Sequence, residues 1–381
     1  MKRLMNSGMT RRQVLQVTAG GIIVSGLGAG RAAAQGYDDT FTWISPRGTL
    51  EVLDDYGYWI GQKMGYFGDL DVEMQPGPSD GTATVKFVDV GQADMGFPSP
   101  GVFSFGLENG MDLKSVFHMG ALDTFSLAFR KGEGPKDIKG IEGKTILLGS
   151  AAWQPIVDPM LAAQGVDIST INYVEAGWPT WGTALAAGQG DAALAWEGLR
   201  AEWISTGLDF EYWLGVKESP LPANTFVVRG SDLEDGAKVD FLKKYLRGWA
   251  MGMEFAEHNP AAAVQAVFDQ FPTLASNLGP QQGMMSILQQ ANVFRGDMSK
   301  REGWGWHDMA SWQKFFDLSA QIGQNSNPIQ ATDALTNALI ADANDYDLEK
   351  VKSDANAAGV PETFADVDVQ MLRDTMFDQS I

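Results

Sequence analysis

The pattern of apolar and polar positions between residues 144 and 197 predicts alternating strands and helices. Short apolar runs ended by glycine or by a polar turn indicate strands at 144–149, 171–174 and 192–196. Helical spacing of apolar residues lies between them, at 155–164 and 180–187. Parallel neighbouring strands need a connection of this kind. The stretch therefore predicts two crossover units on one parallel sheet.

The same alternation precedes this stretch. Strands are expected at 40–45 and 71–74, and a turn at 91–96 is expected to lead into a third short strand. Helices are expected at 50–64, 82–88 and 98–108. Further strands are expected within 116–130, at 210–214 and at 225–229. After residue 240 the spacing is helical, at 241–258, 260–270, 280–293, 304–323 and 331–343. Two sheet-containing halves and a helical tail predict that the chain crosses between lobes near 125–130 and 224–229.

The first 34 residues have the pattern of an export signal. A basic start with adjacent Arg11 and Arg12 precedes a weakly apolar stretch, and 32–34 supplies an A-x-A cleavage site. Five glycines between Gly20 and Gly30 weaken the alternative of a membrane-spanning helix. The segment resembles a twin-arginine signal, so we expect a cleaved, periplasmic protein.

Composition restricts partners and chemistry. The formal charge of −20 becomes about −25 when the five basic residues of the signal are removed, and such a surface repels nucleic acid and anionic lipid. The chain has no cysteine, which excludes a disulfide framework, a lipid-anchor cysteine and thiolate chemistry. With three scattered histidines and no Gly-x-Ser-x-Gly motif, we find no catalytic or metal-binding constellation.

The strand ends of the central unit predict a small-molecule site. Ligands of parallel sheets bind beyond the carboxyl ends of the strands. Those ends hold Ser150, Trp153, Gly177, Trp178, Trp196 and Glu197. The tryptophans could instead pack helices against the sheet, and Glu197 could be a solvated strand end; facing a cleft, it would favour a cationic or N–H-bearing ligand.

Five motifs in order resemble periplasmic solute-binding proteins of the nitrate, sulfonate, taurine and thiamine-pyrimidine group, which serve ABC importers. The motifs lie at 65–67, 72–74, 91–96, 141–146 and 189–192. The resemblance covers roughly residues 40–349. It implies a two-lobed α/β periplasmic binding protein fold of type II, in which two mostly parallel sheets flanked by helices are joined by two crossover strands and close on a ligand by hinge motion.

The resemblance also implies domain bounds and ligand contacts. Lobe one is expected at 37–124 plus 230–381, and lobe two at 125–229. The loops that bind ligand in this family correspond here to Ser45, Arg47, Phe97, Ser99, Asp123, Thr124, Ser150, Trp153, Trp178, Trp196 and Glu197. Tyr58 and Trp59 of the first helix are added, one expected to line the cleft and the other to pack in the core.

Arg47 and the aromatic residues indicate different ligands. A cleft-facing Arg47 would bind a carboxylate or sulfonate; otherwise it is a surface charge. It is the single obvious cation near the expected site, so the tryptophans and Glu197 favour an aromatic or nitrogen-heterocyclic solute, with a sulfonate or taurine-type anion as the alternative.

We therefore expect a monomeric, non-enzymatic binding protein without cofactor or metal, which delivers a small molecule to an inner-membrane ABC permease. A thiamine-pyrimidine-synthase-like enzyme is the alternative on the same fold. The chemistry of that branch depends on a cysteine-rich motif, which this chain lacks.

Overall fold

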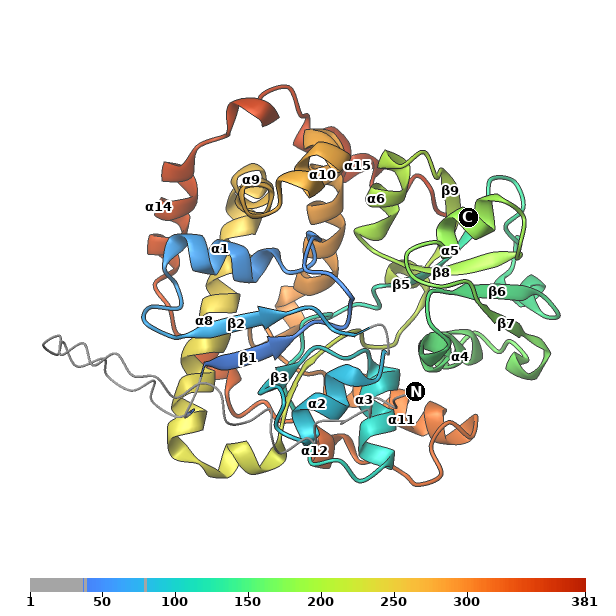
Figure 1. The fold of residues 1–381 in the computed structure, drawn as a ribbon, viewed down its shortest axis with the longest axis horizontal. Coiled ribbons are helices and arrows are strands. Elements are labelled where there is room, and N and C mark those ends of the chain that lie inside the picture. The colour runs from blue at the N-terminus through green and yellow to red at the C-terminus, as the bar shows by residue number, and fades with distance from the viewer. Residues whose placement is uncertain (1–36, 38–39, 79–80) are drawn as a thin grey trace, which may run out of the picture. The chain divides into compact units, whose positions relative to one another are not determined.

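The computed structural model describes residues 37, 40–78 and 81–381, which belong to the compact unit Ala34–Ile381 (Figure 1). The expected export signal at 1–34 lies outside the described residues. Within the described residues, the strands form two five-stranded sheets.

The first sheet has the strand order β2-β1-β3-β10-β4. Its strands are β1 (Phe41–Ile44), β2 (Val72–Gln75), β3 (Met95–Gly96), β4 (Lys114–Phe117) and β10 (Phe226–Val228). Strand β1 pairs in parallel with β2 and β3, whereas β10 is antiparallel to β3 and β4. A strand from late in the sequence thus completes the sheet that the first residues begin.

The second sheet has the order β7-β6-β8-β5-β9. Its strands are β5 (Phe125–Arg130), β6 (Thr145–Leu148), β7 (Asn172–Glu175), β8 (Ala192–Trp196) and β9 (Phe210–Leu214). Strand β6 pairs in parallel with β7 and β8, which confirms the two predicted crossover units, and β5 runs antiparallel to β8 and β9. The bounds expected for the two lobes stay a prediction.

Helices flank both sheets and make up most of the C-terminal part (Figure 1). The helices that connect strands are α1 (Tyr56–Met64), α2 (Ala83–Asp89), α3 (Pro100–Glu108), α4 (Gln154–Ala162), α5 (Trp181–Ala186), α6 (Leu199–Ser205) and α7 (Gly215–Glu218). The C-terminal helices are α8 (Gly236–His258), α9 (Pro260–Gln270), α10 (Pro272–Arg295), α11 (Met309–Gln321), α12 (Ala331–Ala334), α13 (Ile340–Ala343), α14 (Leu348–Ala358) and α15 (Val369–Thr375).

Helices α1 and α8 pack closely because glycines face one another where they meet. A Cβ atom on Gly252 would lie 2.0 Å from the carbonyl oxygen of Gly57, so neither helix could approach as closely with a larger residue at Gly252. Trp249, one turn earlier on α8, is fully buried between Trp43 and Tyr58. Burial of a side chain of this size stabilises the fold by roughly 2–3 kcal/mol.

Three predicted helices begin several residues later in the structure or are divided there. The helix expected at 50–64 begins only at Tyr56, because Asp54 and Asp55 form ion pairs with Arg47 in the preceding turn. The helix expected at 304–323 begins at Met309, where the Asp308 carboxylate caps it. The helix expected at 331–343 is two short helices, α12 and α13.

The residues after α15 cover the edge of the second sheet. The Tyr212 amide donates to the Gln379 carbonyl at 2.8 Å, and the Ile381 amide donates to the Tyr212 carbonyl at 2.9 Å. Figure 1 shows this end of the chain beside β9. We call residues 376–381 the edge segment; it satisfies backbone groups of β9 that an edge strand otherwise leaves open.

Candidate functional site

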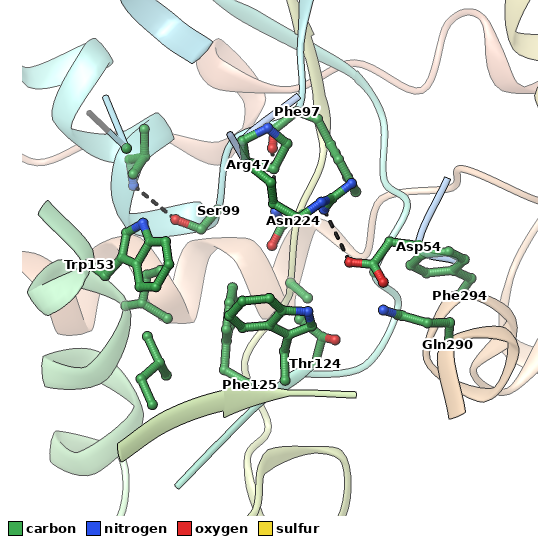
Figure 2. Close-up of a pocket in the computed structure, with 18 residues that line it drawn as sticks. Arg47, Asp54, Phe97, Ser99, Thr124, Phe125, Trp153, Asn224, Gln290 and Phe294 are labelled. Carbon is green, nitrogen blue, oxygen red and sulfur yellow. Dashed lines mark hydrogen bonds and ion pairs between the residues drawn. The ribbon is translucent and has the colours of Figure 1, made fainter. Parts of the chain in front are cut away.

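A pocket lies where residues that follow β1 and β3 meet the end of β8 and the start of β5 (Figure 2). Its volume is about 70 Å³. Six of the predicted site residues line it: Arg47, Phe97, Ser99, Thr124, Trp153 and Trp196. An apolar cavity that binds benzene measures about 150 Å³. A ring-sized solute therefore requires the walls of this pocket to move apart.

Arg47 does not present a free guanidinium to the pocket. Its Nη2 atom binds both carboxylate oxygens of Asp55 at 2.7 and 2.8 Å, and its Nη1 atom lies 3.1 Å from Oδ2 of Asp54. Burial acts to lower the pKa of Arg47, but the charges of Asp55 and Asp54 outweigh it and raise the pKa. The positive charge that could bind an anionic ligand is thus already paired within the protein.

Asp54 is the acidic residue that lines the pocket, and it is not among the predicted site residues. It is 5 % exposed. Burial raises its pKa, whereas the Arg47 charge and the nearby Gln290 and Trp196 side chains lower it. The negative charge of Asp54 also affects Glu202. Burial and, to a smaller extent, the Asp54 charge raise the pKa of Glu202 to about 8.

Aromatic side chains form much of the remaining wall. Phe97 comes from the residues after β3, Phe125 begins β5, and Phe294 belongs to α10 (Figure 2). The ring of Trp153 meets the ring of Trp196 edge-on, with centroids 6.0 Å apart. Such a lining favours a ligand with apolar or flat faces, and it accepts a cation over the ring faces.

The tryptophans of the second sheet form a cluster that positions Trp196. Trp178 and Trp181 both stack on Trp196, with centroids 6.0 and 5.8 Å away. Trp181 is 1 % exposed and donates its indole N–H to the Leu194 carbonyl at 2.7 Å. Trp178 supports the pocket wall from behind, and it does not itself line the pocket.

Helix α10 contributes Gln290 and Phe294, four residues apart and so on one helix face. Figure 2 shows the Gln290 amide beside the Asp54 carboxylate. The Nε2 atom of Gln290 also donates to the backbone carbonyl of Glu197 at 2.7 Å. The neighbouring Gln289 accepts the Gly198 amide at 3.1 Å, so α10 holds the turn after β8 at two points.

Glu197 neither projects into solvent nor lines the pocket. Its side chain is 0 % exposed and binds Arg200 through two hydrogen bonds, of 2.7 and 3.1 Å. Burial raises the pKa of Glu197, and the Arg200 charge opposes this effect. Asp54 takes the place in the pocket wall that the sequence suggested for Glu197.

Ser45, Ser150 and Asp123, which the sequence also predicts as site residues, do not line the pocket and form local hydrogen bonds instead. Buried Ser45 accepts the Arg47 amide at 3.1 Å, and Ser150 caps the short 3₁₀-helix Ala151–Trp153. Asp123 is buried in the segment between β4 and β5, and it accepts the Phe125 amide at 3.0 Å. Burial raises the pKa of Asp123 to about 7.

Tyr58 and Trp59 both pack among the helices of the core, and neither lines the pocket. The Tyr58 ring contacts Phe67 and Trp249, and the Trp59 ring meets Phe271 edge-on. The sequence pattern expected one of the two to line the cleft. Helix α1 instead turns this face towards α8 and α9.

A Ser-His-Asn arrangement lies beside strand β4 of the first sheet, and none of its three residues lines this pocket. The Nε2 atom of His307 lies 2.7 Å from the Ser115 hydroxyl, and its Nδ1 atom lies 2.8 Å from the Asn337 side-chain oxygen. Ser115 and His307 are both 0 % exposed, so a substrate cannot reach them. The trio joins β4 to the segments near 307 and 337, which is a structural role.

Residues 37, 40–78 and 81–381 contain no group of three or more histidine, aspartate or glutamate side chains placed to hold a metal ion. Every helix within the same ranges is too short or too polar to cross a membrane.

The two sheets with their flanking helices and helical C-terminal region define a periplasmic binding protein fold, as the resemblance implied. The NMT1/THI5-like family model matches residues 54–263. The chain therefore belongs to the NMT1/THI5-like family.

Solved structures with this fold are distant in sequence. The alkanesulfonate-binding protein SsuA from Xanthomonas axonopodis pv. citri, bound to MOPS, is 14% identical, with a TM-score of 0.59 and coverage of 78% of this chain and 97% of that one. The ligand-binding component of an ABC-type import system from Staphylococcus aureus, with zinc bound, is 12% identical, with a TM-score of 0.58 and coverage of 81% and 99%.

The periplasmic aliphatic sulphonate-binding protein SsuA from Escherichia coli is 12% identical, with a TM-score of 0.55 and coverage of 78% of this chain and 97% of that one. No curated protein sequence matches this chain significantly.

Proposed function

We propose that this protein is the substrate-binding component of an ABC importer. In this proposal a twin-arginine signal exports the chain to the periplasm, where the mature monomer captures a small organic solute and delivers it to an inner-membrane permease. Family membership and the fold support this proposal, since solved proteins described as sulfonate-binding or import components share that fold.

The observation that carries the proposal is the pocket itself. It is built from both halves of the chain: Arg47 and Phe97 come from one side, and Trp153 and Trp196 come from the other. A relative movement of the two sheets would open and close it, which is the hinge behaviour of periplasmic binding proteins. The proposed ligand contacts are Arg47, Asp54, Phe97, Ser99, Thr124, Phe125, Trp153, Trp196, Asn224, Gln290 and Phe294.

The aromatic walls favour an aromatic or nitrogen-heterocyclic solute over an inorganic anion. A sulfonate or taurine-type ligand is the second candidate, supported by the names of the similar structures. Against it, the guanidinium of Arg47 is already held by Asp54 and Asp55. An enzymatic role is disfavoured, because the chain has no cysteine, and His307 lies buried away from the pocket.

Calorimetry on the purified mature protein, with a panel of aromatic, heterocyclic and sulfonated solutes, tests the proposal. We expect saturable binding of one chemical class, with the bound solute recovered unchanged. Chemical conversion of a solute, or the absence of binding across the whole panel, would contradict it. Mass spectrometry of the protein under native conditions offers an independent test, because it would detect a solute retained through purification.

A further inference from the structure

The charge balance at the pocket is negative. Among the residues that line it, Arg47 and Asp54 are the charged ones, and Asp55 lies directly behind them. One guanidinium is therefore shared by two carboxylates, and all three side chains are at least nine-tenths buried.

The pocket also contains buried polar atoms without a hydrogen-bond partner. They are Oδ1 of Asp54, Oδ1 of Asn224 and Nε of Arg47. The Asp54 carboxylate as a whole is also close enough to the Gln290 and Trp196 side chains for hydrogen bonding from them to lower its pKa. The Asn224 amide is oriented by its Nδ2 atom, which donates to the Phe97 carbonyl at 3.3 Å and leaves the oxygen as the free acceptor. Buried polar groups in native proteins are nearly always paired, so two free acceptors in one pocket wall indicate a ligand that donates hydrogen bonds.

The aromatic residues of the wall point to the same class of ligand. Phe97, Phe125, Phe294, Trp153 and Trp196 surround a pocket whose one unbalanced charge is negative. Ring faces attract cations, and this attraction grows when water is excluded. An aromatic enclosure with an acidic residue at its wall is a combination suited to an ammonium group.

Resting on the proposed function, we propose that the pocket selects a solute carrying one positive charge on nitrogen, whose N–H groups bind Oδ1 of Asp54 and Oδ1 of Asn224. The apolar part of this solute lies against the aromatic walls. An acceptor atom of the solute, next to its charged nitrogen, can accept a hydrogen bond from the unpaired Nε–H of Arg47. Asp54 is the residue that determines the charge of the ligand.

The same arrangement disfavours a sulfonate or carboxylate. An anion in the pocket would lie beside a carboxylate that is only partly compensated, in surroundings where charges are poorly screened. Without rearrangement Arg47 could offer such an anion only its Nε–H, because its Nη1 and Nη2 atoms are held by Asp54 and Asp55. To bind the anion through Nη1 or Nη2, Arg47 would have to release one of its two carboxylate partners. Each released carboxylate would then be buried and unpaired, which is strongly unfavourable.

Two matched series of solutes test this inference by calorimetry. The first is benzylamine, benzyl alcohol and phenylmethanesulfonate; the second is propylamine, propanol and propanesulfonate. At pH 7 we expect each amine to bind at least about tenfold more tightly than the alcohol and the sulfonate of its series. In Asp54→Asn the amine should lose this advantage, because the amide keeps the shape and removes the charge.

Asp71→Asn is the matched control, because it removes the same charge from an exposed position after α1. It should leave the preference for the amine unchanged. Tighter binding of a sulfonate, equal binding of amine and alcohol, or an unchanged preference in Asp54→Asn would overturn the inference while the proposed function stands. Binding of no member of either series would also overturn it, and the wider panel would then decide on the proposed function separately.

Discussion

The Nε2 atom of Gln290 donates a hydrogen bond of 2.7 Å to the backbone carbonyl of Glu197, and this bond joins α10 to the turn after β8. Both groups are buried. Gln290→Ala should therefore lower the free energy of unfolding by about 1–3 kcal/mol, because it leaves a buried carbonyl unpaired. Urea titration measures the change. The matched control is Gln154→Ala, which removes an exposed bond to Asp158 and should change stability far less.

The buried ion pair between Glu197 and Arg200 predicts a second effect on stability. Arg200→Met should destabilise the protein by about 3–5 kcal/mol, because Glu197 would remain as an unpaired buried charge. The double variant Glu197→Gln with Arg200→Met should recover much of this loss. A double variant as unstable as the single one would show that the other bonds of Arg200, to Met376 and Gln379, dominate.

Trp196 should contribute directly to ligand affinity. Trp196→Ala is expected to weaken binding of the solute identified by calorimetry by about 1–3 kcal/mol, the range for a buried aromatic contact. Trp59→Ala is the control, because Trp59 packs on Phe271 away from the pocket. An unchanged dissociation constant in a folded Trp196→Ala variant would remove Trp196 from the binding site.

Asp123 predicts a pH dependence of stability. Burial raises the pKa of Asp123 to about 7 in the folded protein, whereas an aspartate in the unfolded chain has a pKa of about 3.9. Between these values the folded protein keeps a proton that the unfolded chain releases. The contribution of Asp123 to the free energy of unfolding is therefore fully present below about pH 4. It decreases as the pH rises and is lost once the pH has passed about 7.

Asp123→Asn should reduce the loss of unfolding free energy between pH 4 and 8. The reduction is at most about 4 kcal/mol, since one pKa unit corresponds to about 1.4 kcal/mol. Urea titrations at a series of pH values measure the difference. Asp71→Asn, at an exposed position, should keep the decline of the parent protein. A parent-like slope in Asp123→Asn would contradict the prediction.

The sheet architecture could be predicted from the sequence because its signal is local. In the unit from β6 to β8, each short apolar run predicts a strand and each helical spacing predicts a helix without information from elsewhere in the chain. The structure pairs β6 in parallel with both β7 and β8. Helix α6 escaped prediction: it has only seven residues, and it begins directly after Gly198. Its stability depends on packing, which a local pattern does not express.

The pocket could be predicted only in part. Strand ends identified Trp153 and Trp196, because side chains at the carboxyl ends of strands share one edge of a sheet. Gln290 and Phe294 escaped because α10 is distant in sequence, although their spacing of four places them on one helix face. Asp54 escaped because no local pattern shows that Arg47 would hold it against the pocket.

The edge segment leads to one more prediction. A variant lacking residues 376–381 should exchange the Tyr212 amide hydrogen faster than the full chain, because that amide loses its acceptor at Gln379. Hydrogen exchange with mass spectrometry measures the rate. Lys217→Ala, which removes only a side-chain bond to Ser380, should leave it unchanged. Equal exchange in the truncated and full chains would show that Tyr212 is protected by other means.

The pairing between β9 and the edge segment also means that the second sheet is incomplete without the C-terminal residues. Phe210 and Gln379 are hydrogen-bonded although 169 positions separate them in the sequence. A ribosome must add that whole interval before the contact can form, so β9 has an open side for much of synthesis. For the same reason, a fragment cut out at residues 125–229 would expose this side permanently, and we expect it to self-associate by strand addition.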